Sequence, residues 1–110
     1  MSPELEDRFQ ELASLPVGWN FGHGCGSAKE VQERARCFAN SAESMDNEVS
    51  IFPEEGGGIL VSLGLYEFLF LPGEDSLIEV TYDLDHNYYK HVTDEGALLF
   101  LIFGPSSLDK

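Results

Sequence analysis

The feature that most constrains this chain is a change of hydrophobic period after Asp46. Before that residue, apolar side chains recur every three or four positions, as they do on one face of a helix. After it they recur at every second position as far as Val92, in short runs separated by turns rich in glycine, proline and aspartate. Such alternation sends successive side chains to opposite faces of a strand, so it predicts an antiparallel sheet with one covered face.

Two helices are expected in the first half of the chain. Ser2 and Pro3 fit the N-cap and the first position of a helix that ends before Pro16. Ser27 and Glu30 have the spacing of a capping box that opens a second helix. One face of this second helix is apolar and should meet the sheet, through Val31, Ala35, Phe38, Ala42 and Met45. Its opposite face is polar and carries Gln32, Glu33, Arg36 and Glu43.

Five strands are expected from the alternating runs, at residues 49–52, 59–63, 66–70, 78–82 and 88–92. The last apolar run, Ala97–Phe103, fits either a buried strand or a helix that Thr93 caps and that ends at Gly104 and Pro105. We favour the strand, because the run is short and apolar on both faces. The sequence therefore predicts one α+β domain over residues 1–110, with two N-terminal helices packed on an antiparallel sheet of about five strands.

The chain is strongly acidic: 20 Asp and Glu residues oppose six Lys and Arg residues, giving a formal net charge of −14. The acids are spread along the whole chain, which indicates a folded negative surface. Such a surface repels nucleic acid and anionic membranes and attracts basic proteins, although the charge equally serves solubility alone. No apolar run approaches the roughly 20 residues that span a bilayer. The acidic N-terminus lacks a signal peptide, so we expect a cytoplasmic protein with reduced cysteines.

A glycine-rich loop precedes the second helix, with Gly22, Gly24 and Gly26 at alternate positions. Backbone amides at a helix N-terminus favour anions, so a phosphate-binding loop is conceivable. No strand precedes the loop, however, and its spacing does not match the dinucleotide-binding pattern. The sequence favours a packing loop that Trp19 and Phe21 anchor across the core.

Three soft ligands, His23, Cys25 and Cys37, are the candidates for a metal site. The first two lie too close together for a typical zinc site, and no fourth ligand is evident. Cys25 is also a candidate nucleophile, because a helix N-terminus lowers a thiol pKa, but the acidic surroundings oppose this and no third residue orients it. We therefore expect no metal, no cofactor and no enzymatic activity, with Cys37 pointing into the core.

Two segments, residues 15–22 (LPVGWNFG) and 51–59 (IFPEEGGGI), together resemble a group of small uncharacterised bacterial and phage proteins. The group combines a Gly-Trp-Asp-Gly loop, one helix and a Pro-x-x-Gly-Gly-Ile entry into a short sheet. This chain has Asn20 in place of the aspartate and Phe21 inserted before the next glycine, and residues 60–62 replace the group's Leu-Glu-Trp. The resemblance covers about half of the chain and implies the fold and a bacterial or phage setting, without an activity.

The predicted function is that of an acidic inhibitor which neutralises a basic, nucleic-acid-handling protein, in the manner of an antitoxin, an immunity protein or an anti-defence protein such as an anti-CRISPR. Such a surface competes with nucleic acid for a positive groove. The predicted contacts are turn acids and two tyrosines, namely Glu54, Glu55, Glu74, Asp75, Asp83, Asp85, Tyr88 and Tyr89. The tyrosines equally suit a role in covering the sheet edge. The alternative function is an assembly subunit that self-associates through a strand at residues 97–103. The chain itself is expected to be a monomer or a homodimer.

Overall fold

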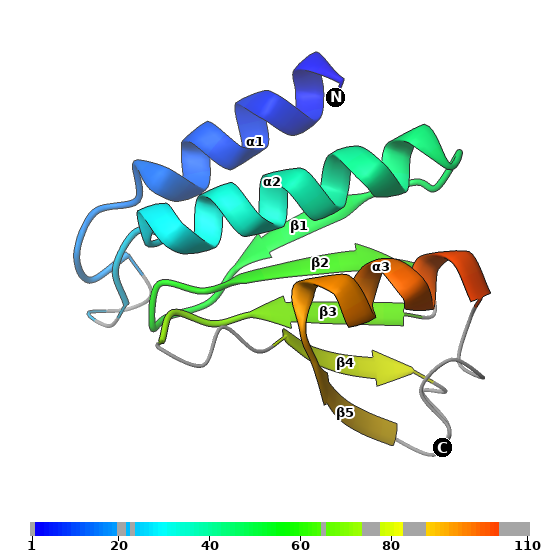
Figure 1. Cartoon of the computed structure of the whole chain (residues 1–110). Helices are drawn as coiled ribbons and strands as arrows, with labels where there is room; N and C mark the ends of the chain where they lie inside the picture. The colour runs from blue at the N-terminus through cyan, green and yellow to red at the C-terminus, as the bar shows by residue number, and fades with distance from the viewer. Residues whose placement is uncertain are drawn as a thin grey trace.

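The computed structural model describes residues 2–19, 22, 24–64, 66–73, 78–82 and 88–103, and at residues 82 and 88–90 it describes the backbone only. Its elements are, in chain order, α1 (Pro3–Ala13), α2 (Lys29–Ser44), β1 (Ser50–Pro53), β2 (Ile59–Leu63), β3 (Tyr66–Phe70), β4 (Ile78–Tyr82), β5 (Tyr88–Val92) and α3 (Asp94–Phe103) (Figure 1). The five strands form one antiparallel sheet in sequential order. The predicted α+β class and five-stranded sheet are confirmed, but a third helix covers the C-terminal segment.

Helix α1 begins as the sequence predicts. The hydroxyl of Ser2 accepts a hydrogen bond from the Leu5 amide at 3.3 Å, and Pro3 occupies the first turn, where its missing N–H leaves no bond unmade. The buried face consists of Leu5, Phe9 and Leu12. The helix ends at Ala13, slightly before the proline that was expected to stop it.

Helix α2 begins differently from the prediction, because Ala28 is its N-cap and no side chain caps it. The Ser27 hydroxyl instead accepts a hydrogen bond from the Gln32 side chain at 2.7 Å. The Ala28 amide donates to the carbonyl of Gly57, in the turn between β1 and β2, at 2.9 Å. The predicted capping box is therefore wrong. The backbone carbonyl of Gly57, in a distant turn, binds the amide at this helix end, where a local side chain was expected.

The faces of α2 also depart from the prediction at three positions. Gln32, expected on the polar face, is buried and donates from its side chain to the Phe9 carbonyl of α1 at 2.7 Å. Cys37, expected in the core, is exposed. Met45 lies beyond the last helical residue and is 41% exposed. The sheet, α1 and α3 all contact α2, so its buried surface is wider than one apolar stripe.

The segment after β5 is helix α3, so the strand favoured for residues 97–103 is wrong and the alternative is correct. Thr93 caps this helix, since its hydroxyl accepts a hydrogen bond from the Gly96 amide at 3.1 Å. The Phe100 ring packs edge-on against Tyr66 and Phe68 of β3, with centroid distances of 4.9 and 5.5 Å. The segment lacks a visible helical period because the outward positions of α3 are apolar as well.

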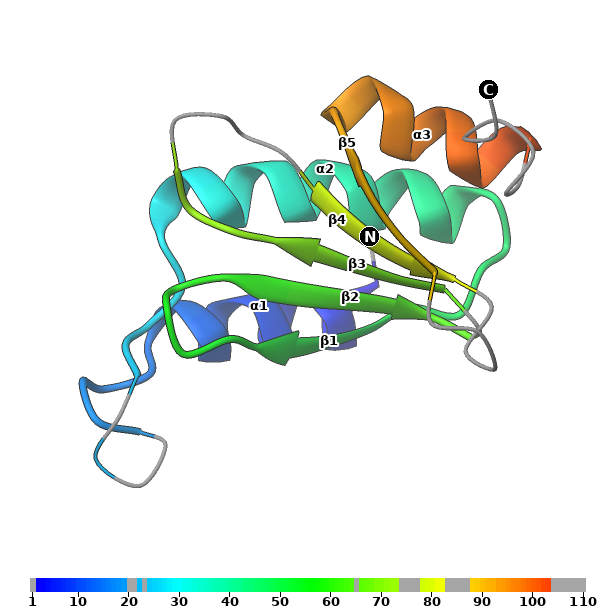
Figure 2. The same cartoon turned by 90° about the horizontal axis from the view of Figure 1, so that it is seen from below.

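All three helices pack on one face of the sheet (Figures 1 and 2). Helix α1 contacts β1, α2 contacts β2 and β3, and α3 contacts β4 and β5 as well as α2. The inward residues of the strands alternate as predicted and form the core with the helices; they are Ile51, Ile59, Val61, Leu63, Phe68, Phe70, Ile78, Val80 and Val92. No described element covers the other face of the sheet.

Candidate protein-binding surface

The uncovered face of the sheet carries an apolar row that crosses three strands. Phe52 of β1 is paired in register with Leu60 of β2, and Leu60 is paired with Leu69 of β3. Phe52 is 46% exposed, and both leucines are half-buried. Residues directly opposite one another in an antiparallel sheet have adjacent side chains, so these three form a continuous strip.

The same row ends with Glu79 and His91, which lie opposite each other. Leu69 is in register with Glu79 of β4, which is in register with His91 of β5. The Glu79 carboxylate lies 3.7 Å from the His91 ring nitrogen Nε2, and the His91 side chain is 61% exposed. A solvent-exposed pair at this distance holds its partners weakly, which leaves the Glu79 carboxylate accessible to another cation.

A second row, next to the first, is polar. It runs through Ser50, Ser62, Glu67 and Thr81, one residue from each of β1 to β4. An apolar strip beside serine, threonine and glutamate has the make-up of a protein interface, in which an apolar centre is bordered by polar side chains. We call the two rows together the sheet-face patch; its members are Phe52, Leu60, Leu69, Glu79, Ser50, Ser62, Glu67 and Thr81.

Two shallow hollows border this patch along β1. One of about 320 Å³ lies between α1 and β1 and is lined in part by Glu4, Val49 and Phe52. The other, of about 450 Å³, lies where α2 leads into β1 and is lined in part by Asp46 and Glu48. Ser50 lines both hollows. The apolar row therefore begins at a concave margin that carries carboxylates.

Arg36 and Arg8 are held by contacts within the fold. Arg36 binds the carboxylate of Glu6 and lies over the Phe9 ring, 5.2 Å from its centroid. The hydrogen bond from Arg36 holds the pKa of Glu6 below its ordinary value. Arg8 donates to the Ile51 carbonyl and binds a neighbouring carboxylate of α1, both at 3.2 Å.

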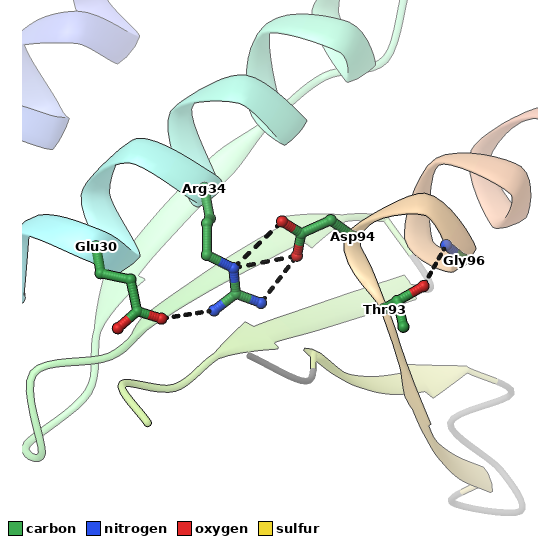
Figure 3. Close-up of polar contacts among 5 residues, drawn as sticks. All are labelled: Glu30, Arg34, Thr93, Asp94 and Gly96. Carbon is green, nitrogen blue, oxygen red and sulfur yellow. Dashed lines mark hydrogen bonds and ion pairs between the residues drawn. The ribbon is translucent and has the colours of Figure 1, made fainter. Parts of the chain in front are cut away.

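Arg34 joins α2 to α3 (Figure 3). Its guanidinium binds Asp94 at 2.9 Å and Glu30 at 3.5 Å, and it lies 5.6 Å from the Phe70 ring centroid. The side chain is only 11% exposed. The hollow beside it measures about 40 Å³, well below the roughly 300 Å³ of a small ligand site. All three arginines are thus bound to groups of the fold, and the chain has only six Lys and Arg residues to offset its 20 acids.

The predicted contact residues do not form one described patch. The Glu54 side chain folds over the turn that follows it. Its carboxylate accepts hydrogen bonds from the amides of Gly56 at 2.7 Å and Gly58 at 3.0 Å. Glu55 follows it and is exposed, and its carbonyl accepts from the Cys25 amide at 3.1 Å. The other predicted acids lie outside the described residues, and these are Glu74, Asp75, Asp83 and Asp85. The side chains of Tyr88 and Tyr89 are likewise not described.

The glycine-rich loop packs against the turn between β1 and β2. Three amides at the start of α2 are already bonded to carbonyls of the fold: Cys25 to Glu55, Ser27 to Leu12 and Ala28 to Gly57. Carbonyls of the fold therefore occupy these three donors, which pack the end of the loop against its neighbours.

Trp19 packs on its own loop. Its indole N–H donates to the Cys25 carbonyl at 2.7 Å. Its ring lies so close to Gly24 that a Cβ added there would be 2.7 Å from the indole nitrogen, which leaves no room for a larger residue. Trp19 is half-buried in a loop that projects from the body of the molecule (Figure 2), so it does not anchor the loop across the core as predicted. Phe21, the other predicted anchor, lies outside the described residues.

The metal site considered from the sequence gains no support. No group of three or more histidine, cysteine, aspartate or glutamate side chains is placed to hold a metal ion in the described part of the chain. His23 lies outside that part. Cys25 points its thiol toward the Glu55 carbonyl, at 3.6 Å, and Cys37 is on the surface of α2.

Sequence reasoning missed the sheet-face patch, although one signal for it was present. The alternation that sent Phe68 inward also sent Glu67 and Leu69 outward. What the pattern lacked was the register, which places Phe52, Leu60 and Leu69 side by side.

Comparison with known proteins adds no relative: no protein-family model matches the chain, and no curated protein or solved structure is significantly similar to it. Within the described residues, no helix has both the length and the apolar character needed to cross a membrane.

Proposed function

We propose that this chain is a non-catalytic binding protein that inhibits a basic, nucleic-acid-handling protein by docking on it through the sheet-face patch. One observation supports this most directly. The three arginines are bound to carboxylates and carbonyls of the fold itself, while an apolar row with Glu67 and Glu79 beside it lies on the one sheet face that no described helix covers. An apolar centre within a negative field suits a partner whose own surface is apolar and cationic.

Inhibition follows from the charge of the occupied surface. A basic groove that binds nucleic acid also attracts a compact body of net charge −14, and the two ligands compete for it. Electrostatic attraction accelerates the encounter, and burial of Phe52, Leu60 and Leu69 slows dissociation. The antitoxin, immunity or anti-defence role and the bacterial or phage setting stay predictions within this proposal.

The test is affinity capture at low salt with three forms of the protein: wild type, Leu69→Lys and Val17→Lys. Leu69→Lys places a cation in the patch, whereas Val17, which is 89% exposed in the glycine-rich loop, receives the same change as a matched control. We expect a basic protein to be captured by wild type and Val17→Lys, and at least tenfold less of it by Leu69→Lys.

The captured protein is then purified, and its binding is measured as salt is raised, because screening weakens interactions between exposed charges. Its nucleic-acid binding is measured with and without the acidic protein. Capture that is equal for Leu69→Lys, affinity that is unchanged by salt, or nucleic-acid binding that is unaffected would each contradict the proposal.

A second candidate function, self-association, is favoured by the outer surface of α3. Leu99 and Ile102 lie one turn apart on it and are 42% and 58% exposed. Because the segment is a helix, the assembly through a C-terminal strand that the sequence predicted is not available to it. Light scattering on wild type and Ile102→Glu separates the two functions: a dimer that the substitution dissociates supports assembly, and a monomer at all concentrations removes it.

A further inference from the structure

The spacing of the apolar row indicates what kind of partner segment it accepts. Adjacent strands lie about 4.8 Å apart, so the step from Phe52 to Leu60 and the step from Leu60 to Leu69 are each about that long. A helix rises about 1.5 Å per residue, so its apolar positions i, i+3 or i+4, and i+7 are spaced by about 4.5–6 Å. In an extended segment, side chains on one face recur at about 6.7 Å, which does not match the row.

Addition of a partner strand at the nearest edge is also disfavoured. Strand β1 is the edge strand beside Phe52. The Arg8 side chain donates to the Ile51 carbonyl at 3.2 Å, which occupies an acceptor that a new strand would need. Pro53, at the end of β1, has no N–H to offer. These are features by which proteins block pairing at sheet edges.

The acidic side chains near the end of the row indicate where the partner segment carries a cation. Glu79 follows Leu69 in the row, one strand spacing farther on, and Glu67 lies in the neighbouring row. A helix whose apolar face covers Phe52, Leu60 and Leu69 would bring its residue i+10 or i+11 to Glu79. A lysine or arginine there would replace the exposed His91 as the partner of Glu79.

We propose that the sheet-face patch binds a basic amphipathic helix of the partner, which lies across the strands with apolar residues at i, i+3 or i+4, and i+7 and a cation at i+10 or i+11. This inference rests on the proposed function, because it names the segment that the same surface recognises. Recognition of an amphipathic helix through apolar anchors at this spacing is a general mode of peptide binding.

The probes are two synthetic peptides of 18 residues with the same composition. The first places leucines at helical spacing among lysines, arginines and alanines, and the second arranges the same residues so that the leucines alternate. Affinity is measured at low salt by fluorescence anisotropy with wild type, Leu69→Lys, Glu79→Gln and the control Val17→Lys. Circular dichroism follows the helix content of each peptide as it binds.

We expect the helical peptide to bind wild type at least tenfold more tightly than the alternating peptide and to gain helix content on binding. Leu69→Lys should weaken its binding at least tenfold and Glu79→Gln about twofold to fivefold, whereas Val17→Lys should have no comparable effect. Circular dichroism of each variant alone establishes that it is folded.

Three results would overturn the inference, and they separate it from the proposed function. Equal binding of both peptides, with loss in Leu69→Lys, would retain the patch as the binding site and reject the helix. Binding of the helical peptide that is insensitive to Leu69→Lys would reject the patch and, with it, both proposals. If neither peptide binds, the helix is rejected, and the capture experiment alone decides the proposed function.

Discussion

Phe68 and Leu69 are neighbours in β3, yet they lie in opposite environments. Phe68 is fully buried between α2 and α3, with the rings of Phe38 and Phe100 at centroid distances of 4.5 and 5.5 Å. Leu69 is half-buried on the face that no described element covers. The comparison teaches that the strand pattern creates two faces but leaves open which side chains become core, because that depends on where the helices pack.

The two sides differ in their polar contacts as well. On the helix side, two arginines and one amide are engaged across elements: Arg36 with Glu6, Arg34 with Asp94, and Gln32 with the Phe9 carbonyl. On the uncovered side, the ring of His91 lies 3.7 Å from the Glu79 carboxylate, with the His91 side chain 61% exposed. One side is built for stability, and the other presents groups that a second molecule can engage.

The largest expected effect is on the covered face. Phe68→Ala should reduce the free energy of unfolding by about 3–5 kcal/mol, because it leaves a cavity among packed rings. Leu69→Ala, its neighbour on the uncovered face, should cost less than about 1.5 kcal/mol, because half-burial means fewer lost contacts. Urea unfolding measures both losses of stability. If Phe68→Ala is too unstable to measure, Phe68→Leu takes its place and should still cost more than Leu69→Ala. Equal losses for the two positions would refute the distinction between the faces.

The next effect concerns the polar contacts within the helix layer. Gln32→Met should cost about 1–3 kcal/mol, because the volume is kept while the Phe9 carbonyl, the Ser27 hydroxyl and the Arg36 guanidinium each lose a hydrogen-bond partner. Gln10→Met on the exposed side of α1 is the matched control and should change stability by less than about 0.5 kcal/mol. Chemical denaturation of both variants checks this, and similar values for the two would show that the bond between α1 and α2 contributes little.

A smaller effect is expected at the helix that covers β4 and β5. Thr93→Ala removes the hydroxyl that accepts from the Gly96 amide and should cost about 1 kcal/mol. Thr93→Ser keeps the hydroxyl and should retain most of the stability. Thermal unfolding of the two variants measures the difference, and the absence of one would mean that packing of Phe100 alone holds α3 in place.

The smallest effect is a pH dependence at the surface of the helix layer. Arg36 lowers the pKa of Glu6 in the folded state below its ordinary value of 4.5, so the stabilisation is present above that value and is lost as the pH falls through the lowered pKa. Glu6→Gln should therefore destabilise the protein slightly at neutral pH, and the difference from wild type should vanish in acid. Glu33→Gln, which removes an exposed charge from α2, is the control. A difference that persists at low pH would contradict the assignment.

Much of the fold could be predicted because it depends on local patterns. The alternation of Ile59, Val61 and Leu63 gave β2 with its buried face, and Ser2 with Pro3 gave the start of α1. The capping box at Ser27 failed, because the distant Gly57 carbonyl binds the amide at that helix end. The carboxylate of Glu54, a predicted contact, closes its own turn, which the sequence pattern did not indicate.

Hydrophobic periodicity thus determined the strands and the first two helices, because side-chain direction follows from residue order. Composition determined the acidic character, because net charge follows from the number of acids and bases. Tertiary structure decided the rest. It made residues 94–103 a helix, since a segment that is apolar all round takes its form from the surfaces it packs on. It aligned Phe52, Leu60 and Leu69 across three strands, because strand register is set by long-range pairing that no single strand encodes.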